Sequence, residues 1–195
     1  MKYVAFIGSR DMNQFSEERV LLYMDAVRAA VQHGYVVVTG ACKGVDQLAA
    51  EVALASGGRV LLVLPYPLYE RLWVNETQAK FPENVRVEVY NPENHPVWTE
   101  SVTKYHPAPT QLSEPAIRMH ARNYGIVGRA GWVVALPNFE KGGGGTAQGL
   151  RIAAGMNKPC WDLRDQKQCV DLMKRLMRAP SAPAQPEALA ENSEA

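Results

Sequence analysis

Residues 132–148, with the sequence WVVALPNFEKGGGGTAQ, join a strand-like apolar run to a glycine-rich loop and the start of a helix-like segment. The first five residues are all apolar, which is typical of a strand buried on both faces of a sheet. Glycines lack a Cβ atom and adopt positive φ angles easily, so their amide groups can converge on one anion, and a helix N-terminus adds about half a positive charge. The residues expected to bind phosphate are Gly142, Gly143, Gly144, Gly145 and Thr146. A flexible surface loop is the alternative.

Similar apolar runs recur along the chain, separated mostly by segments with the spacing of amphipathic helices. The runs cover residues 3–7, 35–39, 60–64, 85–90, 132–136 and 159–163. Helices are expected at residues 20–31, 45–56, 68–80, 114–129, 146–156 and 166–177. The alternation predicts an α/β fold: a single doubly wound Rossmann-like domain whose mostly parallel sheet of about six strands has helices on both faces.

The composition suits one domain followed by a tail. The chain has 195 residues, of which 47% are hydrophobic and 21% charged, enough for one well-buried core. We place the domain at residues 1–178. Residues 179–195 contain three prolines, three acidic residues and no basic one, so a disordered tail is expected there. Without the tail, 21 basic residues stand against 17 acidic ones, a surplus that suits small anions.

Residues 91–112 interrupt the alternation of strands and helices. They contain four prolines, two histidines and Trp98, and they show neither period. A connection of this length is unusual inside a compact domain. We therefore expect an irregular insertion that acts as a lid or an oligomer contact, with plain disorder as the third alternative.

The sequence offers no sign of a metal centre, a disulfide framework or a membrane segment. Its cysteines, Cys42, Cys160 and Cys169, form no Cys-x-x-Cys pair, and no histidine pair has ligand spacing. No cofactor is expected other than a nucleotide bound as a ligand. The N-terminus lacks the pattern of a signal peptide, and no apolar segment approaches the ~20 residues of a membrane span. A cytoplasmic protein without membrane contact is expected.

Two other glycine-containing turns follow predicted strands, and the carboxyl ends of parallel strands meet at the sheet edge where ligands bind. The first turn has Gly8, Ser9 and Arg10, and the second has Gly40, Lys43, Gly44 and Asp46. The hydroxyl and cationic groups suit phosphate, arginine as a bidentate fork and lysine as a point charge. A carboxylate suits ribose hydroxyls instead. Asp46 is therefore the candidate sugar contact, with stabilisation of a helix N-terminus as its alternative.

The common phosphate motifs fit this chain poorly. The P-loop pattern G-x-x-x-x-G-K-[ST] is absent from the sequence, which argues against ordinary ATP or GTP hydrolysis. The dinucleotide pattern G-x-G-x-x-A fits Gly142, Gly144 and Ala147, and Asp162 lies about twenty residues further on. This match is weak because it lies late in the chain and outside the first strand–helix–strand unit.

Two segments carry the motifs of one known superfamily. Residues 38–49, VTGACKGVDQLA, have a glycine-rich turn followed by G-[IV]-D, and residues 119–123, MHARN, precede the strand and loop quoted above. The first segment resembles the DNA-processing protein A branch of the SLOG superfamily, and the second resembles the Lonely Guy pattern M-H-x-R-[KN] with its later glycine-rich loop. The resemblance covers roughly residues 3–163. It implies nucleotide binding, with Arg122 and Asn123 facing the ligand, and a homo-oligomer, expected to be a dimer.

One departure from the Lonely Guy pattern decides how the function is interpreted. Those enzymes cleave the N-glycosidic bond of nucleoside monophosphates with an arginine and an acidic residue two or three positions after the motif threonine, where this chain has Gln148 and Gly149. Glutamine cannot replace a carboxylate in acid–base catalysis. The leading hypothesis is therefore binding of a nucleotide or ADP-ribose-like ligand by phosphate and ribose.

Two other functions stay open. The first is a phosphoribohydrolase or nucleotide N-glycosidase with Arg122 and a relocated carboxylate such as Asp46 as catalytic residues. The second is single-stranded DNA binding in the manner of the DNA-processing branch. Nucleic acid is the less favoured partner, because the positive surplus is modest and no basic stripe is interleaved with aromatic residues.

Overall fold

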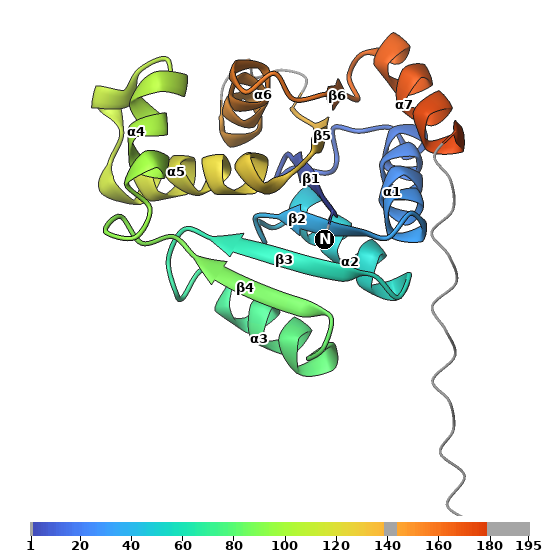
Figure 1. Cartoon of the computed structure of the whole chain (residues 1–195), viewed down its shortest axis with the longest axis horizontal. Helices are drawn as coiled ribbons and strands as arrows, with labels where there is room; N and C mark the ends of the chain where they lie inside the picture. The colour runs from blue at the N-terminus through green and yellow to red at the C-terminus, as the bar shows by residue number, and fades with distance from the viewer. Residues whose placement is uncertain (1, 139–143, 179–195) are drawn as a thin grey trace, which may run out of the picture.

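The computed structural model describes residues 2–138 and 144–178, which form one sheet of six parallel strands between two layers of helices (Figure 1). The strands are β1 (Lys2–Gly8), β2 (Tyr35–Thr39), β3 (Arg59–Leu64), β4 (Val85–Val89), β5 (Trp132–Leu136) and β6 (Cys160–Asp162). They lie side by side in the order β4-β3-β2-β1-β5-β6. This arrangement confirms the predicted doubly wound α/β fold.

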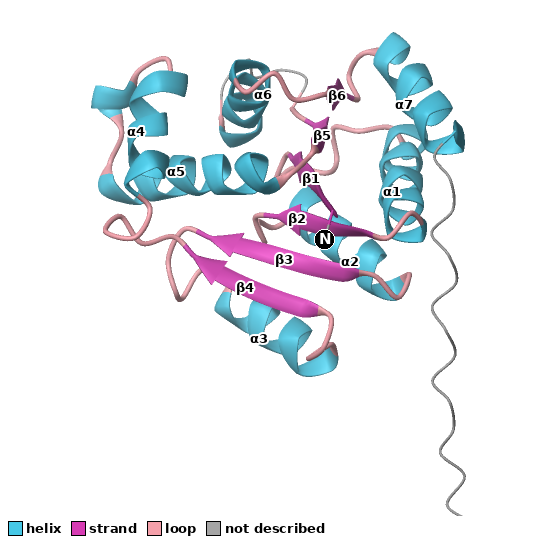
Figure 2. Ribbon diagram, viewed as in Figure 1, coloured by secondary structure: helices cyan, strands magenta, loops and turns pink. Residues whose placement is uncertain are grey.

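The helices alternate with the strands along the chain (Figure 2). They are α1 (Glu17–Gln32), α2 (Val45–Ala55), α3 (Arg71–Lys80), α4 (Pro96–Tyr105), α5 (Glu114–Arg129), α6 (Gly145–Gly155) and α7 (Gln166–Arg178), with a short 3-10 helix, η1 (Pro109–Gln111). None of the helices in the described part of the chain is long and apolar enough to cross a lipid bilayer.

Strand β1 explains why an uninterrupted apolar run is needed at the centre of the sheet. Val4 and Phe6 belong to the core that α1, α2 and α7 cover, whereas Ala5 and Ile7 belong to the core under α4, α5 and α6. Successive side chains of a strand point to opposite faces. Because both faces are covered by helices, both sets must be apolar.

The prediction of an irregular segment over residues 91–112 is wrong in part, because α4 lies within it. Trp98, which is 8% exposed, and Val102, which is 3% exposed, are the buried apolar residues of this helix. A Cβ atom at Gly125 of α5 would lie 2.3 Å from the Trp98 ring, so that glycine gives the indole its space. The helix has only ten residues, which leaves too few apolar positions for a helical period to stand out. A role as a lid or an oligomer contact stays a prediction.

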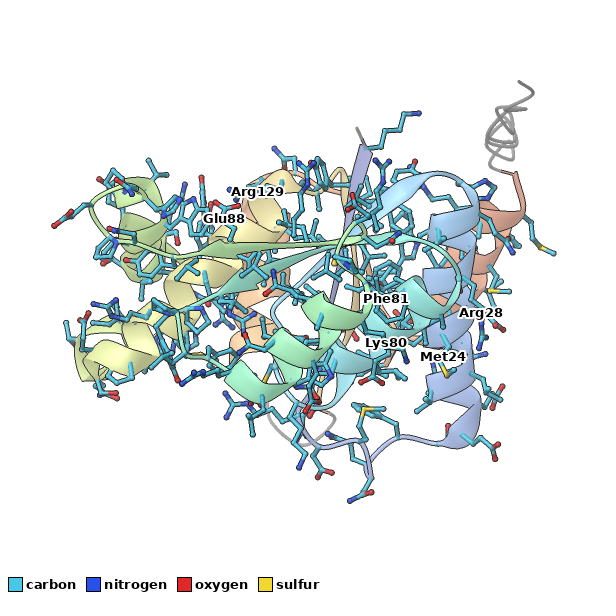
Figure 3. All side chains as sticks on the ribbon, turned by 90° about the horizontal axis from the view of Figure 1, so that it is seen from below. Met24, Arg28, Lys80, Phe81, Glu88 and Arg129 are labelled. Atoms are coloured by element: carbon cyan, nitrogen blue, oxygen red, sulfur yellow. The ribbon has the colours of Figure 1, made fainter. Side chains whose placement is uncertain are left out.

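Polar contacts attach α4 to both the sheet and α5. The side chain of Glu88 in β4 accepts a hydrogen bond from Arg129 at the end of α5, and these two residues lie together in Figure 3. The Arg129 guanidinium also lies 4.9 Å from the centre of the Trp98 ring. Glu88 also lies 3.4 Å from Nε2 of His95, the residue before α4. Residues 91–112 therefore include a helix, α4, that is packed against the rest of the domain.

The strand order reverses beside β1, and this reversal positions the site. β1 pairs with β2 on one side and with β5 on the other. The connection after β1 passes to one side of the sheet and the connection after β5 passes to the other. In open α/β sheets, this divergence leaves a crevice at the carboxyl ends of the two strands, where ligands usually bind.

Candidate functional site

A cavity of about 470 Å³ opens at the carboxyl ends of β1 and β5, bounded by α5 and the start of α6. Its volume falls within the range of ligand sites, roughly 300–1,000 Å³. It is lined by Ile7, Gly8, Ser9, Arg10, Asp11, Cys42, Asp46, Ala116, Met119, His120, Arg122, Asn123, Val127, Pro137, Asn138, Gly144, Gly145, Thr146 and Gly149. The structure thus brings together residues of the first turn, the glycine loop and the arginine-containing helix that the sequence singled out.

The start of α6 forms one wall of the cavity through Gly144, Gly145 and Thr146. Gly144 is the N-cap and has a φ of 93°, a conformation that favours glycine. The amide groups of a first helical turn have no partner within the helix. They are therefore available to an anion beside Thr146. Gly142 and Gly143, which were predicted to share this role, lie outside the described residues.

The turn after β1 forms the opposite wall. The hydroxyl oxygen of Ser9 accepts hydrogen bonds from the Asp11 amide, at 3.1 Å, and from Nε2 of Gln14, at 2.8 Å. A hydroxyl that accepts two hydrogen bonds still has its own hydrogen to donate. The exposed Arg10 donates from Nε to Sγ of Cys42 at 2.9 Å. This contact fixes the arginine at the rim, and the nearby sulfur raises the pKa of Arg10 further above its usual value.

The second predicted turn has a mainly architectural role. Gly40, Lys43 and Gly44 do not line the cavity, and Lys43 is exposed. Gly44 is the N-cap of α2 with a φ of 93°, and a Cβ atom there would lie 2.5 Å from the Arg10 carbonyl oxygen. Glycine is needed at position 8 for a similar reason, because a Cβ atom there would lie 2.2 Å from the side chain of Val45. These glycines let the two turns pack directly against each other.

Arg122 and Asp46 form a buried ion pair across the ends of the strands. Nη1 of Arg122 lies 3.6 Å from Oδ2 of Asp46, and their side chains are 5% and 6% exposed. Gly40 makes the pair possible, since a Cβ atom at that position would lie 1.4 Å from the same Nη1 atom. The other oxygen of Asp46 accepts a hydrogen bond from the Gly8 amide at 3.1 Å. Asp46 thus joins the predicted turns, but it is engaged by protein groups.

The surroundings of this pair set its electrostatics. Burial raises the pKa of Asp46, and the charge of Arg122 together with the Gly8 amide opposes that shift. The guanidinium of Arg122 also lies 6.0 Å from the centre of the Tyr69 ring. Its Nε atom is buried and has no hydrogen-bond partner among the described residues. Arg122 also lines the cavity.

A second polar group, which the sequence analysis did not include in the site, connects α5 to α6. Oε1 of Gln148 lies 2.7 Å from Nδ1 of His120 and accepts from Nδ2 of Asn123 at 2.9 Å. Gln148 is fully buried, so the residue treated above as a missing acid is a structural hydrogen-bonding centre. Asn123 also donates to the Gly145 carbonyl at 3.2 Å. In the sequence, the three-residue spacing of His120 and Asn123, which places both on one helix face, was the signal that could have indicated this group.

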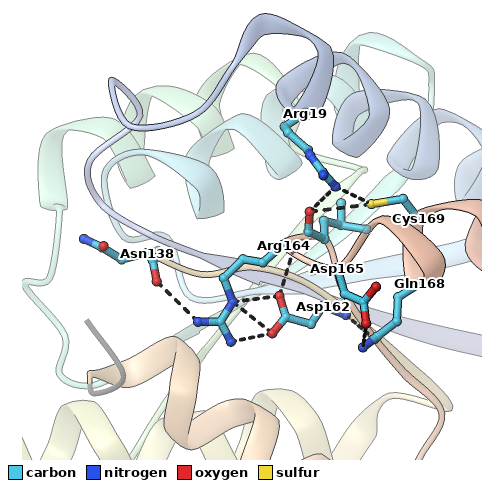
Figure 4. Close-up of polar contacts among 8 residues, drawn as sticks. Arg19, Asn138, Asp162, Arg164, Asp165, Gln168 and Cys169 are labelled. Carbon is cyan, nitrogen blue, oxygen red and sulfur yellow. Dashed lines mark hydrogen bonds and ion pairs between the residues drawn. The ribbon is translucent and has the colours of Figure 1, made fainter. Parts of the chain in front are cut away.

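Asp162, the acidic residue of the weak dinucleotide match, lies outside the cavity. Both of its carboxylate oxygens accept from Arg164, and Figure 4 shows this fork beside the backbone of Asn138. Nη1 of Arg164 reaches the Asn138 carbonyl at 3.5 Å. The carboxylate therefore anchors the segment that follows β5. Arg118, close to Arg122 in sequence, pairs with Glu114 and is also outside the cavity.

Comparison with known families gives one match that covers most of the chain. The family described as DNA recombination-mediator protein A matches residues 1–168. No curated protein sequence matches significantly. The match agrees with the resemblance to the SLOG superfamily that residues 38–49 and 119–123 indicated.

Several solved structures share the fold. DNA processing protein A from Streptococcus pneumoniae is 20% identical with a TM-score of 0.56, and the match covers 90% of this chain but only 56% of that one. DNA processing protein A from Helicobacter pylori, described with a single-stranded DNA binding mode, is 18% identical with a TM-score of 0.56 over 89% of this chain and 72% of that one. The molybdenum cofactor carrier protein from Chlamydomonas reinhardtii is 18% identical with a TM-score of 0.51 over 90% and 84%. At these identities the likeness shows the fold.

Proposed function

The chain belongs to the DNA recombination-mediator protein A family, and from this premise we propose that its cavity binds a nucleotide or ADP-ribose-like ligand by phosphate and ribose. One observation carries the proposal: the open start of α6 faces the turn after β1 across a cavity of about 470 Å³. Helix N-termini and converging amides are common phosphate sites. The phosphate is assigned to Gly144, Gly145 and Thr146, with the Ser9 hydroxyl and Arg10 opposite.

The rest of the ligand is assigned to the inner part of the cavity. The guanidinium group of Arg122, which lines the cavity, suits a ribose or base oxygen. Asp46 is a poorer sugar contact than its residue type indicates, because Gly8 and Arg122 already engage its two oxygens. The molybdenum cofactor carrier protein has a related fold, and its name describes a carrier, which is compatible with binding without turnover.

The buried groups favour binding over cleavage of an N-glycosidic bond. Gln148 has no acidic hydrogen and is fully buried. Asp46 is 4% exposed and paired with Arg122, so it cannot approach a glycosidic oxygen without breaking that pair. General acid–base help is typically worth 10²–10⁴-fold in rate. The other acidic residue of the described cavity lining is Asp11, which is exposed and whose Oδ1 accepts a hydrogen bond from the Asn13 amide.

Single-stranded DNA binding is the second candidate function, and the family match supports it. The relative from Helicobacter pylori is described as binding single-stranded DNA. In this chain, the exposed side chains of Arg10 and Lys43 lie on neighbouring turns at the strand ends. Such a pair can contact successive phosphates of a strand.

Calorimetric titration separates the two functions. AMP, ADP, ADP-ribose and an oligothymidylate are titrated at two salt concentrations. The nucleotide proposal expects a saturable small-ligand isotherm that depends weakly on salt, whereas DNA binding expects affinity that falls steeply with salt. An absence of heat with all three small ligands would refute the nucleotide proposal.

A matched pair of variants tests the position of the phosphate. Gly144→Val and Gly57→Val both place a branched side chain at a positive φ, 93° and 73°, with no atom of the described residues within 4 Å of the new Cβ. Both substitutions therefore strain the backbone, but only Gly144 lines the cavity. Gly144→Val is expected to weaken ADP-ribose binding by about tenfold or more, which is 1.4 kcal/mol or more. Equal effects of the two variants would contradict the assignment.

A further inference from the structure

The orientation of the Gln148 amide follows from the groups around it. Nδ2 of Asn123 donates to the Gly145 carbonyl oxygen, at 3.2 Å, and a carbonyl oxygen only accepts. That contact fixes the Asn123 amide with its nitrogen toward α6. The same nitrogen lies 2.9 Å from Gln148, so the facing atom of Gln148 must be its oxygen. The network therefore determines an orientation that side-chain shape alone does not.

The same reasoning fixes the tautomer of His120. Its Nδ1 atom lies 2.7 Å from the Gln148 oxygen, so Nδ1 must be the nitrogen that bears hydrogen. In a neutral imidazole, the other nitrogen, Nε2, then has a lone pair and accepts hydrogen bonds. Nε2 has no hydrogen-bond partner among the described residues and is not among their buried unpartnered atoms, and His120 lines the cavity. A side chain that lines the cavity thus has an acceptor without a protein partner among the described residues.

The neighbours of His120 favour its neutral form. Burial lowers its pKa, and the positive charges of His106, Arg122 and Arg151 act in the same direction. His106 belongs to the segment after α4 and its ring centre lies 4.5 Å from that of His120, while Arg151 belongs to α6. Arg122 shares α5 with His120. The hydrogen bond to Gln148 opposes the shift.

We propose that His120 determines specificity in the cavity by accepting a hydrogen bond at Nε2 from a hydroxyl or amino group of the ligand, with Gln148 as the residue that positions its ring. The role rests on the nucleotide-binding function proposed above. A neutral imidazole with this tautomer cannot donate to a phosphate from Nε2. His120 therefore selects the sugar or base of the ligand, and the α6 N-terminus binds its phosphate.

The first test reads the tautomer in the full-length chain without ligand. The chain has only four histidines, so ¹⁵N-histidine labelling gives a short set of ring signals, which His120→Phe assigns by loss of one. Hydrogen on Nδ1 of His120 is expected at neutral pH, and Gln148→Met is expected to release that preference, because methionine is similar in length but offers no oxygen acceptor. Hydrogen on Nε2 in the unmodified chain would overturn the inference.

The second test uses ADP-ribose, whose two phosphates stay fully ionised between pH 5 and pH 8, so that its charge does not change. Protonation of His120 turns its Nε2 acceptor into a donor. Affinity is therefore expected to fall as the pH drops through the pKa of His120, which the ¹⁵N ring signals locate, and the fall should reach about tenfold once the ring is protonated, the equivalent of one lost hydrogen bond of about 1.4 kcal/mol. The profile of His120→Phe should be flat and start from the weaker affinity.

The outcomes distinguish this inference from the function on which it rests. Affinity that rises on acidification would mean that an imidazolium contacts phosphate, and a profile of the unmodified chain that stays flat through the pKa of His120 would mean no contact. Either result overturns the role of His120 and leaves nucleotide binding intact. Failure of ADP-ribose to bind at both pH values would overturn the ligand role together with the proposed function.

Discussion

Gly40→Ala is expected to destabilise the protein because the new side chain breaks the ion pair between Arg122 and Asp46. The new Cβ atom would lie 1.4 Å from Nη1 of Arg122 and 2.3 Å from its Cζ. The guanidinium must therefore leave its position, and the long side chain can move toward the cavity. Asp46, which is 4% exposed, then stays buried without its cation.

The cost follows from what remains after the arginine moves. Removing one partner of a buried ion pair typically costs about 3–5 kcal/mol. The distance of 3.6 Å is too long for a hydrogen bond, and the Gly8 amide still donates to Asp46. We therefore expect the lower end of the range, about 3 kcal/mol in the free energy of unfolding at pH 8.

The pH dependence supplies a second signature of the same mechanism. Burial raises the pKa of Asp46 in the folded state, and the charge of Arg122 opposes that rise. A folded carboxyl with a raised pKa binds its proton more tightly than the unfolded one, so its contribution to stability is lost as pH rises through the folded pKa. Loss of the Arg122 charge raises the pKa further and extends this window upward. The deficit of Gly40→Ala should therefore be larger at pH 8 than at pH 5.

Urea unfolding of Gly40→Ala at both pH values measures the effect, and two comparisons make it specific. Gly131→Ala is the matched glycine control, because its Cβ atom would lie 3.7 Å from the nearest atom, an ordinary contact. In an Asp46→Asn background, the cost of Gly40→Ala should shrink, since no buried charge is then left unpaired. A deficit that is independent of pH and unchanged by Asp46→Asn would refute the reasoning.

Two half-buried side chains outside the cavity, Lys158 and Cys160, give further predictions. Lys158→Met is expected to lower the free energy of unfolding by about 1–3 kcal/mol. The reason is that Nζ donates to the carbonyl oxygens of Val127, Gly128 and Ala130 near the end of α5. Urea unfolding measures the loss, and a change below about 0.5 kcal/mol would contradict the prediction. Burial raises the pKa of the Cys160 thiol to about 12, so iodoacetamide at pH 8 should modify it only after unfolding, as peptide mass spectrometry would detect.

Most of the fold could be predicted from the sequence, because hydrophobic period reports burial directly. The apolar run of β1 reads as a strand since both of its faces are covered, and α1 is visible through its apolar stripe. Helix α4 was missed because Trp98 and Val102 alone do not establish a period. Its packing depends on a space at Gly125, which lies in another helix and has no signature near residue 98.

The site was predictable in its location but only partly in the roles of its residues. The turn after β1 and the start of α6 line the cavity because parallel strands end at one edge. Gly40 and Gly44 were assigned to a ligand, yet they make space for Arg122 and for the backbone of Arg10. A glycine permits close approach of any group, and the residue type does not say which group approaches. Contacts between distant segments decide that question.

The space left by the missing side chain at Gly40 also has a consequence for how the sequences of related proteins vary. Arg122 belongs to a helix on one face of the sheet and Asp46 to a helix on the other, and they meet past a position with no side chain. A side chain at position 40 displaces the cation, loss of the cation leaves a buried anion, and loss of the anion leaves a buried cation. Positions 40, 46 and 122 are therefore expected to change as a set. A relative with a larger residue at position 40 should lack the ion pair, and the part of its cavity that Asp46 and Arg122 line here should differ.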